Sequence, residues 1–288
     1  MALKKHALLL FSKPPVPGMV KTRLTAEHGG IFNEYMAAEF FRRSMYDVTE
    51  LCMIALYRLE EENRLEREAD PEADEHVYDF FVSTCPEENV EVMRECFEKI
   101  GQWPREFHYI VDHGANFNEH FDDAFNQIFE LGYDSVLSVG GDIPTMPLEH
   151  VINGFKWLHY YDATTDGNGA VLAPCQECGV SLIGFNKNTP LDHQDVFYAM
   201  DGRPALDAYR EKTAEKDVPV AYMPTVADVD NMQDLAHATT LMRMLKYAAQ
   251  YQPDLYVPIR TLDWLDKIGL KVSTPPNDDF DPRDDLDV

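Results

Sequence analysis

Three cations gather in one short stretch near the start of the chain. Lys13, Lys21 and Arg23 lie within residues 7–24, which read ALLLFSKPPVPGMVKTRL. Ammonium and guanidinium groups bind phosphates through charge-assisted hydrogen bonds. The chain carries a formal net charge of -26, yet residues 1–24 contain no Asp or Glu. Because an acidic protein repels an anionic substrate unless it builds a local positive site, this stretch is the first candidate for a phosphate site.

The residues around these cations predict a strand, a rigid loop and then a helix. The apolar run 7–11 is short enough to be a buried strand. Three prolines and Gly18 then interrupt regular structure, and a helical pattern follows over 31–51. A strand that leads into a cationic loop before a helix is suited to holding phosphates. The alternative is that the loop is an ordinary proline-rich turn.

Two acidic segments could hold a divalent cation. Asp142 follows the apolar run 135–139 in the turn GGDIP, and Asp228 and Asp230 lie just before a helical pattern at 232–250. Carboxylates suit Mg²⁺ or Mn²⁺, which are hard cations that prefer oxygen ligands. The structural alternative for the first is an aspartate that caps a turn. For the second it is a helix cap at Asp230 or the next residue, and spacing alone does not decide.

Composition narrows the class of protein. The apolar fraction of 45% is ordinary for a globular chain of 288 residues, which is enough for one large domain or one domain with additions. No apolar run reaches the roughly 18 residues of a membrane span. Five cysteines at irregular spacing favour reduced thiols in a cytoplasm over a disulfide framework. The acidic balance argues against binding nucleic acid through a basic face.

Familiar nucleotide and metal motifs are missing from the sequence. It contains no G-x-x-x-x-G-K-[ST] and no G-x-G-x-x-G, which disfavours a Walker-type ATPase and a dinucleotide dehydrogenase. Cys175 and Cys178 form a C-x-x-C, but the motif lies between two predicted strands and no second C-x-x-C accompanies it. We therefore do not expect a zinc or redox site there.

Strands alternate with helices through the first 160 residues, which predicts an α/β fold of three layers, α/β/α, with a mainly parallel central sheet. The carboxyl ends of parallel strands meet at one edge, where ligands bind, so the cationic loop and Asp142 should open on the same edge. We expect one domain over 1–250 with a charged insertion at 57–76. Residues 251–288 are a C-terminal extension whose acidic end, 275–288, reads as a solvated, disordered tail, with a binding tail as the alternative.

The stretch Phe11–Leu24, FSKPPVPGMVKTRL, closely resembles the opening motif of a bacterial and archaeal family of nucleotide-diphospho-sugar transferases. This family has a glycosyltransferase-A-like fold and is related to molybdopterin and phospholactate guanylyltransferases. Three further segments match in order: 140–144 is similar to its G-x-D-x-P, 174–185 to its P-A-x-D-G-G-Y-x-L-I-G-L and 228–235 to its D-V-D-T-x-x-D-L. The resemblance spans about residues 7–245.

The resemblance implies a metal-dependent transferase that uses a nucleotide-activated donor. Asp142 would hold Mg²⁺ or Mn²⁺, with Asp230 as the second ligand, and Glu177, Asp195 and Asp201 would serve the acceptor side. Glycosyl transfer from a nucleotide sugar to a small-molecule acceptor is favoured over nucleotidyl transfer from a nucleoside triphosphate. The residues it assigns to the nucleotide are Phe11, Ser12, Lys13, Gly18, Lys21, Arg23 and Gly141, with Lys21, Arg23 and Asp142 as the catalytic set.

One motif departs from the family pattern. In 174–185, Glu177 stands for the acid, Cys178 replaces a glycine and Val180 replaces the aromatic residue. This departure supports an alternative in which the chain binds a nucleotide and has lost turnover. A further alternative is an acidic interaction protein that acts through its tail. The sequence leaves the donor base, the acceptor and the oligomeric state open.

Overall fold

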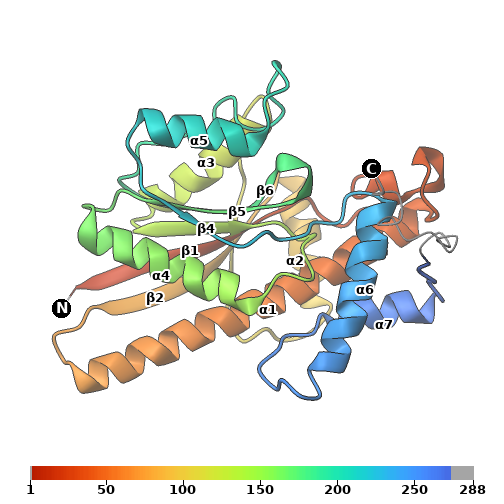
Figure 1. Ribbon diagram of the computed structural model, residues 1–288, viewed down its shortest axis with the longest axis horizontal. Helices are drawn as coiled ribbons and strands as arrows, with labels where there is room; N and C mark the ends of the chain where they lie inside the picture. The colour runs from red at the N-terminus through yellow and green to blue at the C-terminus, as the bar shows by residue number, and fades with distance from the viewer. Residues whose placement is uncertain (1, 274–288) are drawn as a thin grey trace, which may run out of the picture.

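The computed structural model describes residues 2–273, so the predicted tail at 275–288 lies outside the described residues. A seven-stranded sheet forms the middle layer, with the strand order β3-β2-β1-β4-β6-β5-β7 (Figure 1). The strands are β1 Leu3–Phe11, β2 Glu75–Ser83, β3 Phe107–Ile110, β4 Ser135–Val139, β5 Ala170–Pro174, β6 Val180–Asn186 and β7 Val220–Tyr222. All neighbouring strands are parallel except β6, which runs antiparallel to β4 and β5.

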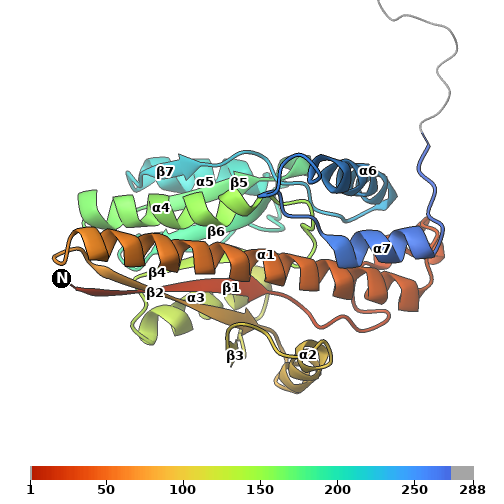
Figure 2. The same cartoon turned by 90° about the horizontal axis from the view of Figure 1, so that it is seen from below.

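Helices cover both faces of this sheet, as the alternating sequence pattern predicts (Figures 1 and 2). The α-helices are α1 Glu34–Ala69, α2 Glu88–Glu98, α3 Phe117–Glu130, α4 Leu148–Thr164, α5 Ala205–Glu215, α6 Met232–Ala248 and α7 Ile259–Lys267. Short 3₁₀ segments lie at Thr22–Leu24, Ala26–His28 and Gln176–Cys178. The predicted three-layer α/β fold is confirmed.

The two faces of the sheet have separate apolar cores. Leu8 and Leu10 of β1 join the core under α1, α2 and α4, whereas Ala7 and Leu9 join the core under α3 and α5. All four side chains are fully buried. Because both faces of a central parallel strand are covered, such a strand reads as a continuous apolar run rather than as an alternating one. This burial on both faces fixes β1 and with it the start of the cationic loop.

Helix α1 is longer than the sequence pattern indicates, because it continues through the charged segment from residue 57 to Ala69. Its middle is buried against the sheet, and Leu59 and Asn63 remain buried within the charged part. Glu, Arg and Leu are strong helix formers, so the charge-dense segment extends the helix. In Figure 2, α1 runs the length of the molecule, with α4 and α7 alongside it.

Residues 251–273 pack against the domain. Leu262, Trp264 and Leu265 of α7 share an apolar cluster with Phe40 of α1 and Leu235 of α6. Within residues 2–273, no helix combines the length and the apolar character needed to cross a membrane.

Candidate active site

Lys21 links the cationic loop to both acidic segments. Its Nζ lies 2.6 Å from Asp142 Oδ2 and 2.7 Å from Asp230 Oδ1, and its side chain is only 8% exposed. Burial lowers the pKa of Lys21, but the charges and hydrogen bonds of the two aspartates outweigh this effect and raise its pKa above the ordinary value. Lys21 is therefore a fixed positive charge at the centre of the site.

Buried apolar side chains on either side of Lys21 hold it in place. Val20 packs against Ala38 and Phe41 of α1, and Leu24 joins the cluster under α7. Lys21 itself adopts a left-handed backbone with φ 49°, which turns the chain between these two anchors. Because the apolar residues of the loop are buried in the core, Lys21 and the exposed Arg23 lie at the edge of the sheet.

Asp142 follows β4 in a turn that requires glycine. Ser44 of α1 donates a 2.8 Å hydrogen bond to the carbonyl oxygen of Gly141 and fixes the turn. A Cβ atom at Gly141 would lie 3.2 Å from Met45, and one at Gly140 would lie 2.6 Å from Asp142 Oδ1. The absence of a side chain at position 140 therefore leaves the room that the Asp142 carboxylate uses.

Asp230 is free of any capping role. Asn231 caps α6 by accepting hydrogen bonds from the backbone N–H groups of Gln233 and Asp234, while the Asp234 carboxylate accepts from the Asn231 N–H. This capping box leaves the Asp230 side chain to pair with Lys21 and, at 3.3 Å, with Arg23. Spacing alone did not decide whether Asp230 or Asn231 caps this helix, and the structure shows that Asn231 does.

A third carboxylate, Asp228, belongs to the same group. Burial raises its pKa to about 7, assisted by the negative charges of Asp142 and Asp230. The Val229 N–H donates to the Asp142 carbonyl oxygen at 3.1 Å, which ties the two acidic segments together. Carboxylate oxygens are the donors that Mg²⁺ and Mn²⁺ prefer, and in this structure the ammonium group of Lys21 lies between those of Asp142 and Asp230. From the D-x-D spacing, the sequence predicted that Asp228 or Asp230 could complete a metal site, and the resemblance favoured Asp230.

These groups surround a cavity of about 690 Å³ at the carboxyl ends of β1 and β4. The cavity volume is within the range of small-molecule sites. Most of the residues predicted for the site line it, and they are Phe11, Ser12, Lys13, Lys21, Arg23, Gly141, Asp142, Glu177 and Asp230. The structure therefore brings together the residues predicted to bind phosphates, those predicted to bind the metal, and one of those predicted to serve the acceptor.

Gly18, Asp195 and Asp201 do not line this cavity. Gly18 turns toward α1, where a Cβ atom would meet the carboxylate of Glu34 at 3.5 Å. Asp195 and Asp201 are exposed, and Asp201 accepts a hydrogen bond from the backbone N–H of Arg203. The segment that contains these aspartates takes positive φ angles at Asp195 and Tyr198, so its aromatic residues face the cavity while its carboxylates face solvent.

An aromatic wall of the cavity was missed by sequence reasoning. Phe11 packs edge-on against Phe117 at the start of α3, with ring centroids 5.5 Å apart. Phe117 in turn contacts Phe197 and Tyr198, at 5.0 and 5.6 Å. Tyr198 is 82% exposed, so its ring is available to a ligand. The sequence signal was the density of aromatic residues near position 117, which an amphipathic helix explained equally well.

The C-x-x-C segment contributes to the wall without an activated thiol. Cys175 and Cys178 both line the cavity, on either side of a tight turn with positive φ at Glu177 and Cys178. Burial raises the pKa of Cys175 to about 12, so its thiol stays protonated near neutral pH. Both cysteines are free thiols.

Comparisons with known proteins support the fold. A family model described as an uncharacterized protein conserved in bacteria (DUF2064) matches residues 73–201. The chain is similar to the crystal structure of a putative nucleotide-diphospho-sugar transferase from Desulfovibrio desulfuricans G20, with a TM-score of 0.65 and 24% identity, covering 91% of this chain and 96% of that one. It also matches 4-diphosphocytidyl-2C-methyl-D-erythritol synthase from Anaerococcus prevotii DSM 20548, with a TM-score of 0.46 and 10% identity over 83% and 96% of the chains.

The search of the curated proteins found no match. The similarity to the Desulfovibrio structure extends over nearly the whole of both chains. This similarity confirms the predicted fold, and the chain shares the α/β fold of the Desulfovibrio structure.

Proposed function

We propose that this protein is a metal-dependent transferase that moves a glycosyl group from a nucleotide sugar to a small acceptor. The observation that carries the proposal is the position of Lys21, a buried cation paired with Asp142 and Asp230 at the rim of a cavity of about 690 Å³. A cation beside a cluster of carboxylates is suited to a substrate that brings both phosphates and a divalent metal. The description of the Desulfovibrio protein as a putative nucleotide-diphospho-sugar transferase supports the same class.

The cavity offers a place for each part of such a donor. Lys21, Arg23 and Lys13 would bind the two phosphates, and the aromatic wall formed by Phe117 and Tyr198 would stack on the base. Asp142 and Asp230 would hold Mg²⁺ or Mn²⁺, and a bound cation would offset charge on the leaving nucleoside diphosphate. The protein contributes mainly orientation and preorganised charge, so it needs no covalent nucleophile of its own.

The transfer needs no reactant besides the nucleotide sugar and the acceptor. The bond between the anomeric carbon and the β-phosphate oxygen breaks, and the nucleoside diphosphate leaves with that electron pair. A hydroxyl oxygen of the acceptor forms the new bond and gives up its proton. Glu177 lines the cavity and is exposed, so we assign it to the acceptor side, where its carboxylate would take this proton.

Product analysis tests this proposal. The protein is incubated with Mn²⁺ and UDP-, GDP-, CDP-, ADP- or dTDP-sugars, with water and a panel of sugars and small alcohols as acceptors, and in parallel with the five nucleoside triphosphates. Release of a nucleoside diphosphate from one nucleotide sugar is the expected result. Release of pyrophosphate from a triphosphate alone identifies a nucleotidyltransferase instead. Binding of a nucleotide with no conversion of any donor identifies a binding protein that has lost turnover.

A pair of arginine variants tests the phosphate assignment. Arg23 is 64% exposed and pairs with Asp230, whereas Arg210 of α5 is equally exposed, at 65%, and pairs with acidic residues away from the cavity. Arg23→Ala should weaken nucleotide binding about 10- to 150-fold, the equivalent of a charged hydrogen bond of roughly 1.5–3 kcal/mol. Arg210→Ala should leave it unchanged. Equal effects of the two variants would show that only net charge matters.

A further inference from the structure

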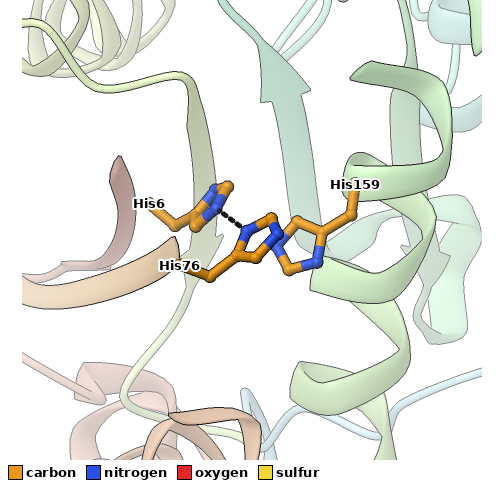
Figure 3. A group of neighbouring side chains, drawn as sticks. All are labelled: His6, His76 and His159. Atoms are coloured by element: carbon orange, nitrogen blue, oxygen red, sulfur yellow. Dashed lines mark hydrogen bonds between the residues drawn. The ribbon is translucent and has the colours of Figure 1, made fainter. Parts of the chain in front are cut away.

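Three histidines meet at the end of the sheet opposite the candidate active site. His6 lies near the start of β1, His76 near the start of β2 and His159 near the end of α4 (Figure 3). One ring nitrogen of each lies within 4.8 Å of the corresponding nitrogens of the other two. The closest pair is His6 Nε2 and His76 Nδ1, which are 2.8 Å apart. These residues are far apart in the sequence, so no sequence motif indicates that they form a group.

The surroundings of these histidines suit a cation. His6 is 2% exposed, and the other two are half-buried. Asp74, Glu66 and Asp162 lie close enough to act electrostatically on His76. The nearby Lys4 opposes a cation, but its ammonium group is paired with Asp162 at 2.6 Å. Burial lowers the pKa of all three imidazoles, that of His159 to about 3, so each is neutral and carries one nitrogen lone pair. A metal bound to both His6 Nε2 and His76 Nδ1 would replace the hydrogen bond between them.

The ring of His6 is already oriented as a metal ligand is. Its Nδ1 lies 2.7 Å from Ser135 Oγ of β4, which fixes the ring and leaves Nε2 to face the other histidines. Metal-binding histidines commonly engage their second nitrogen in this way. Tyr78 supports the cluster on another side, with its hydroxyl 3.3 Å from His159 Nε2.

The spacing of the nitrogens is close to that of a tetrahedral site. Bonds of about 2.0–2.1 Å from Zn²⁺ to imidazole nitrogen place ligand atoms about 3.3 Å apart. The His6 and His76 nitrogens are 2.8 Å apart, and all three nitrogens lie within 4.8 Å of one another, so small movements of the half-buried rings would give this spacing. His76 also lines a surface cavity of about 630 Å³, which provides an entry path and room for water as a fourth ligand.

We propose that His6, His76 and His159 form a binding site for a transition metal ion of the Zn²⁺ class. The ion would join β1, β2 and α4 at the end of the sheet opposite Lys21. Its three nitrogen ligands differ from the carboxylate set at Asp142, so the two ends of the sheet would select different metals. With three protein ligands, the ion would link three elements of the fold and keep its fourth position open to water.

The test measures metal binding to the full chain after chelation and dialysis. Asp142→Asn/Asp230→Asn protein serves as the background, which removes the carboxylate site. Calorimetry with Zn²⁺ and visible spectroscopy with Co²⁺ should show one bound ion, with the absorption bands of tetrahedral Co²⁺. His76→Ala and His159→Ala should each weaken binding at least tenfold and remove the bands. His120→Ala is the matched control, because His120 belongs with Cys85 and Asp112 to a separate group of possible metal ligands.

X-ray absorption of Zn²⁺ bound to the protein with all its histidines intact counts imidazole ligands directly and does not depend on a variant folding. Three histidine ligands support the proposal. Zn²⁺ with fewer than two histidine ligands, binding that persists in both histidine variants, or no Zn²⁺ binding at all would overturn it. In those cases the three rings are a hydrogen-bonded part of the core.

Discussion

The ammonium group of Lys21 and the carboxylate of Asp142 lie 2.6 Å apart, although 121 positions separate them in the sequence. They meet because β1 and β4 are parallel neighbours, with Leu10 paired to Val139, and each residue follows the carboxyl end of its strand. Asp230 reaches the same ammonium group from the segment before α6. Lys21, Asp142 and Asp230 thus form one charged cluster, and each of the three can be replaced separately.

Replacing Lys21 should change the affinities for nucleotide and for Mn²⁺ in opposite directions. In Lys21→Met, nucleotide affinity should fall about 10- to 150-fold because a charged phosphate contact is lost. Mn²⁺ binding without nucleotide should become tighter, since the cation that competes for the carboxylates of Asp142 and Asp230 is gone. Calorimetric titrations with each ligand measure both changes.

Lys246→Met is the control for this variant. Lys246 of α6 also pairs with a carboxylate, that of Asp263 at 2.9 Å, and neither residue lines the cavity. Lys246→Met should leave both affinities unchanged. Weaker Mn²⁺ binding in Lys21→Met would contradict the competition between lysine and metal.

The two adjacent glycines before Asp142 should respond differently to alanine. In Gly140→Ala, the new Cβ lies 2.6 Å from Asp142 Oδ1, so the carboxylate must move while the core stays intact. Metal-dependent nucleotide binding should fall with a stability change of less than about 1 kcal/mol. In Gly141→Ala, the Cβ instead meets Met45 and Phe41 at 3.2 and 3.3 Å, which should cost about 1–3 kcal/mol of stability.

Chemical denaturation and nucleotide titration of both glycine variants make the comparison. Equal losses of stability in the two variants would show that the turn, and not the carboxylate, is the sensitive feature.

The free energy of unfolding of the metal-free protein should depend on pH because Asp228 titrates. Its folded pKa is raised to about 7 from an unfolded value of about 4. Between these values the unfolded chain releases a proton that the folded protein keeps, so this group makes stability fall as pH rises from about 4 to 7. Above pH 7 the carboxylate is ionised in both states and the loss is complete.

Asp228→Asn should remove that pH dependence, so the variant should gain stability over the unmodified protein as pH rises from about 4 to 7. Denaturation in EDTA at a series of pH values measures the difference. Asp254→Asn, whose side chain is 90% exposed, should track the unmodified protein throughout. A constant difference between Asp228→Asn and the unmodified protein would rule out a raised pKa.

Helix α7 should contribute to folding and not to ligand binding. Asp47 of α1 is fully buried and accepts hydrogen bonds from the backbone N–H and the hydroxyl of Thr261, at 2.8 and 2.7 Å. Asp47→Ala leaves these donors and the nearby Arg260 without that partner, and should cost about 2–4 kcal/mol. Asp263→Ala on the exposed side of α7, where Asp263 pairs with Lys246, should cost less than 1 kcal/mol.

Urea denaturation gives both stabilities, and nucleotide titration of the folded Asp47→Ala protein completes the test. Loss of nucleotide affinity in a variant that is still fully folded would contradict the purely structural role of α7.

Much of the fold was predictable because its strands are apolar runs closed by turn residues, as at 7–11 and 135–139. The antiparallel insertion of β6 was not, because a buried strand reads the same in either direction. The meeting of Lys21, Asp142 and Asp230 followed from the rule that ligands bind at the carboxyl ends of parallel strands. The orientation of Asp195 and the aromatic wall depended on positive φ angles and side-chain packing, which spacing does not encode.

The most direct test of the central claim is calorimetric titration of nucleotide sugars and nucleotides into the full chain, with and without Mn²⁺, compared with Asp142→Asn. The account predicts that one nucleotide sugar binds, that Mn²⁺ strengthens its binding at least tenfold, and that Asp142→Asn abolishes the Mn²⁺ effect while the protein remains folded. Failure of every nucleotide to bind, or a Mn²⁺ effect unchanged in Asp142→Asn, would contradict the assignment of Lys21 and Asp142 to a nucleotide–metal site.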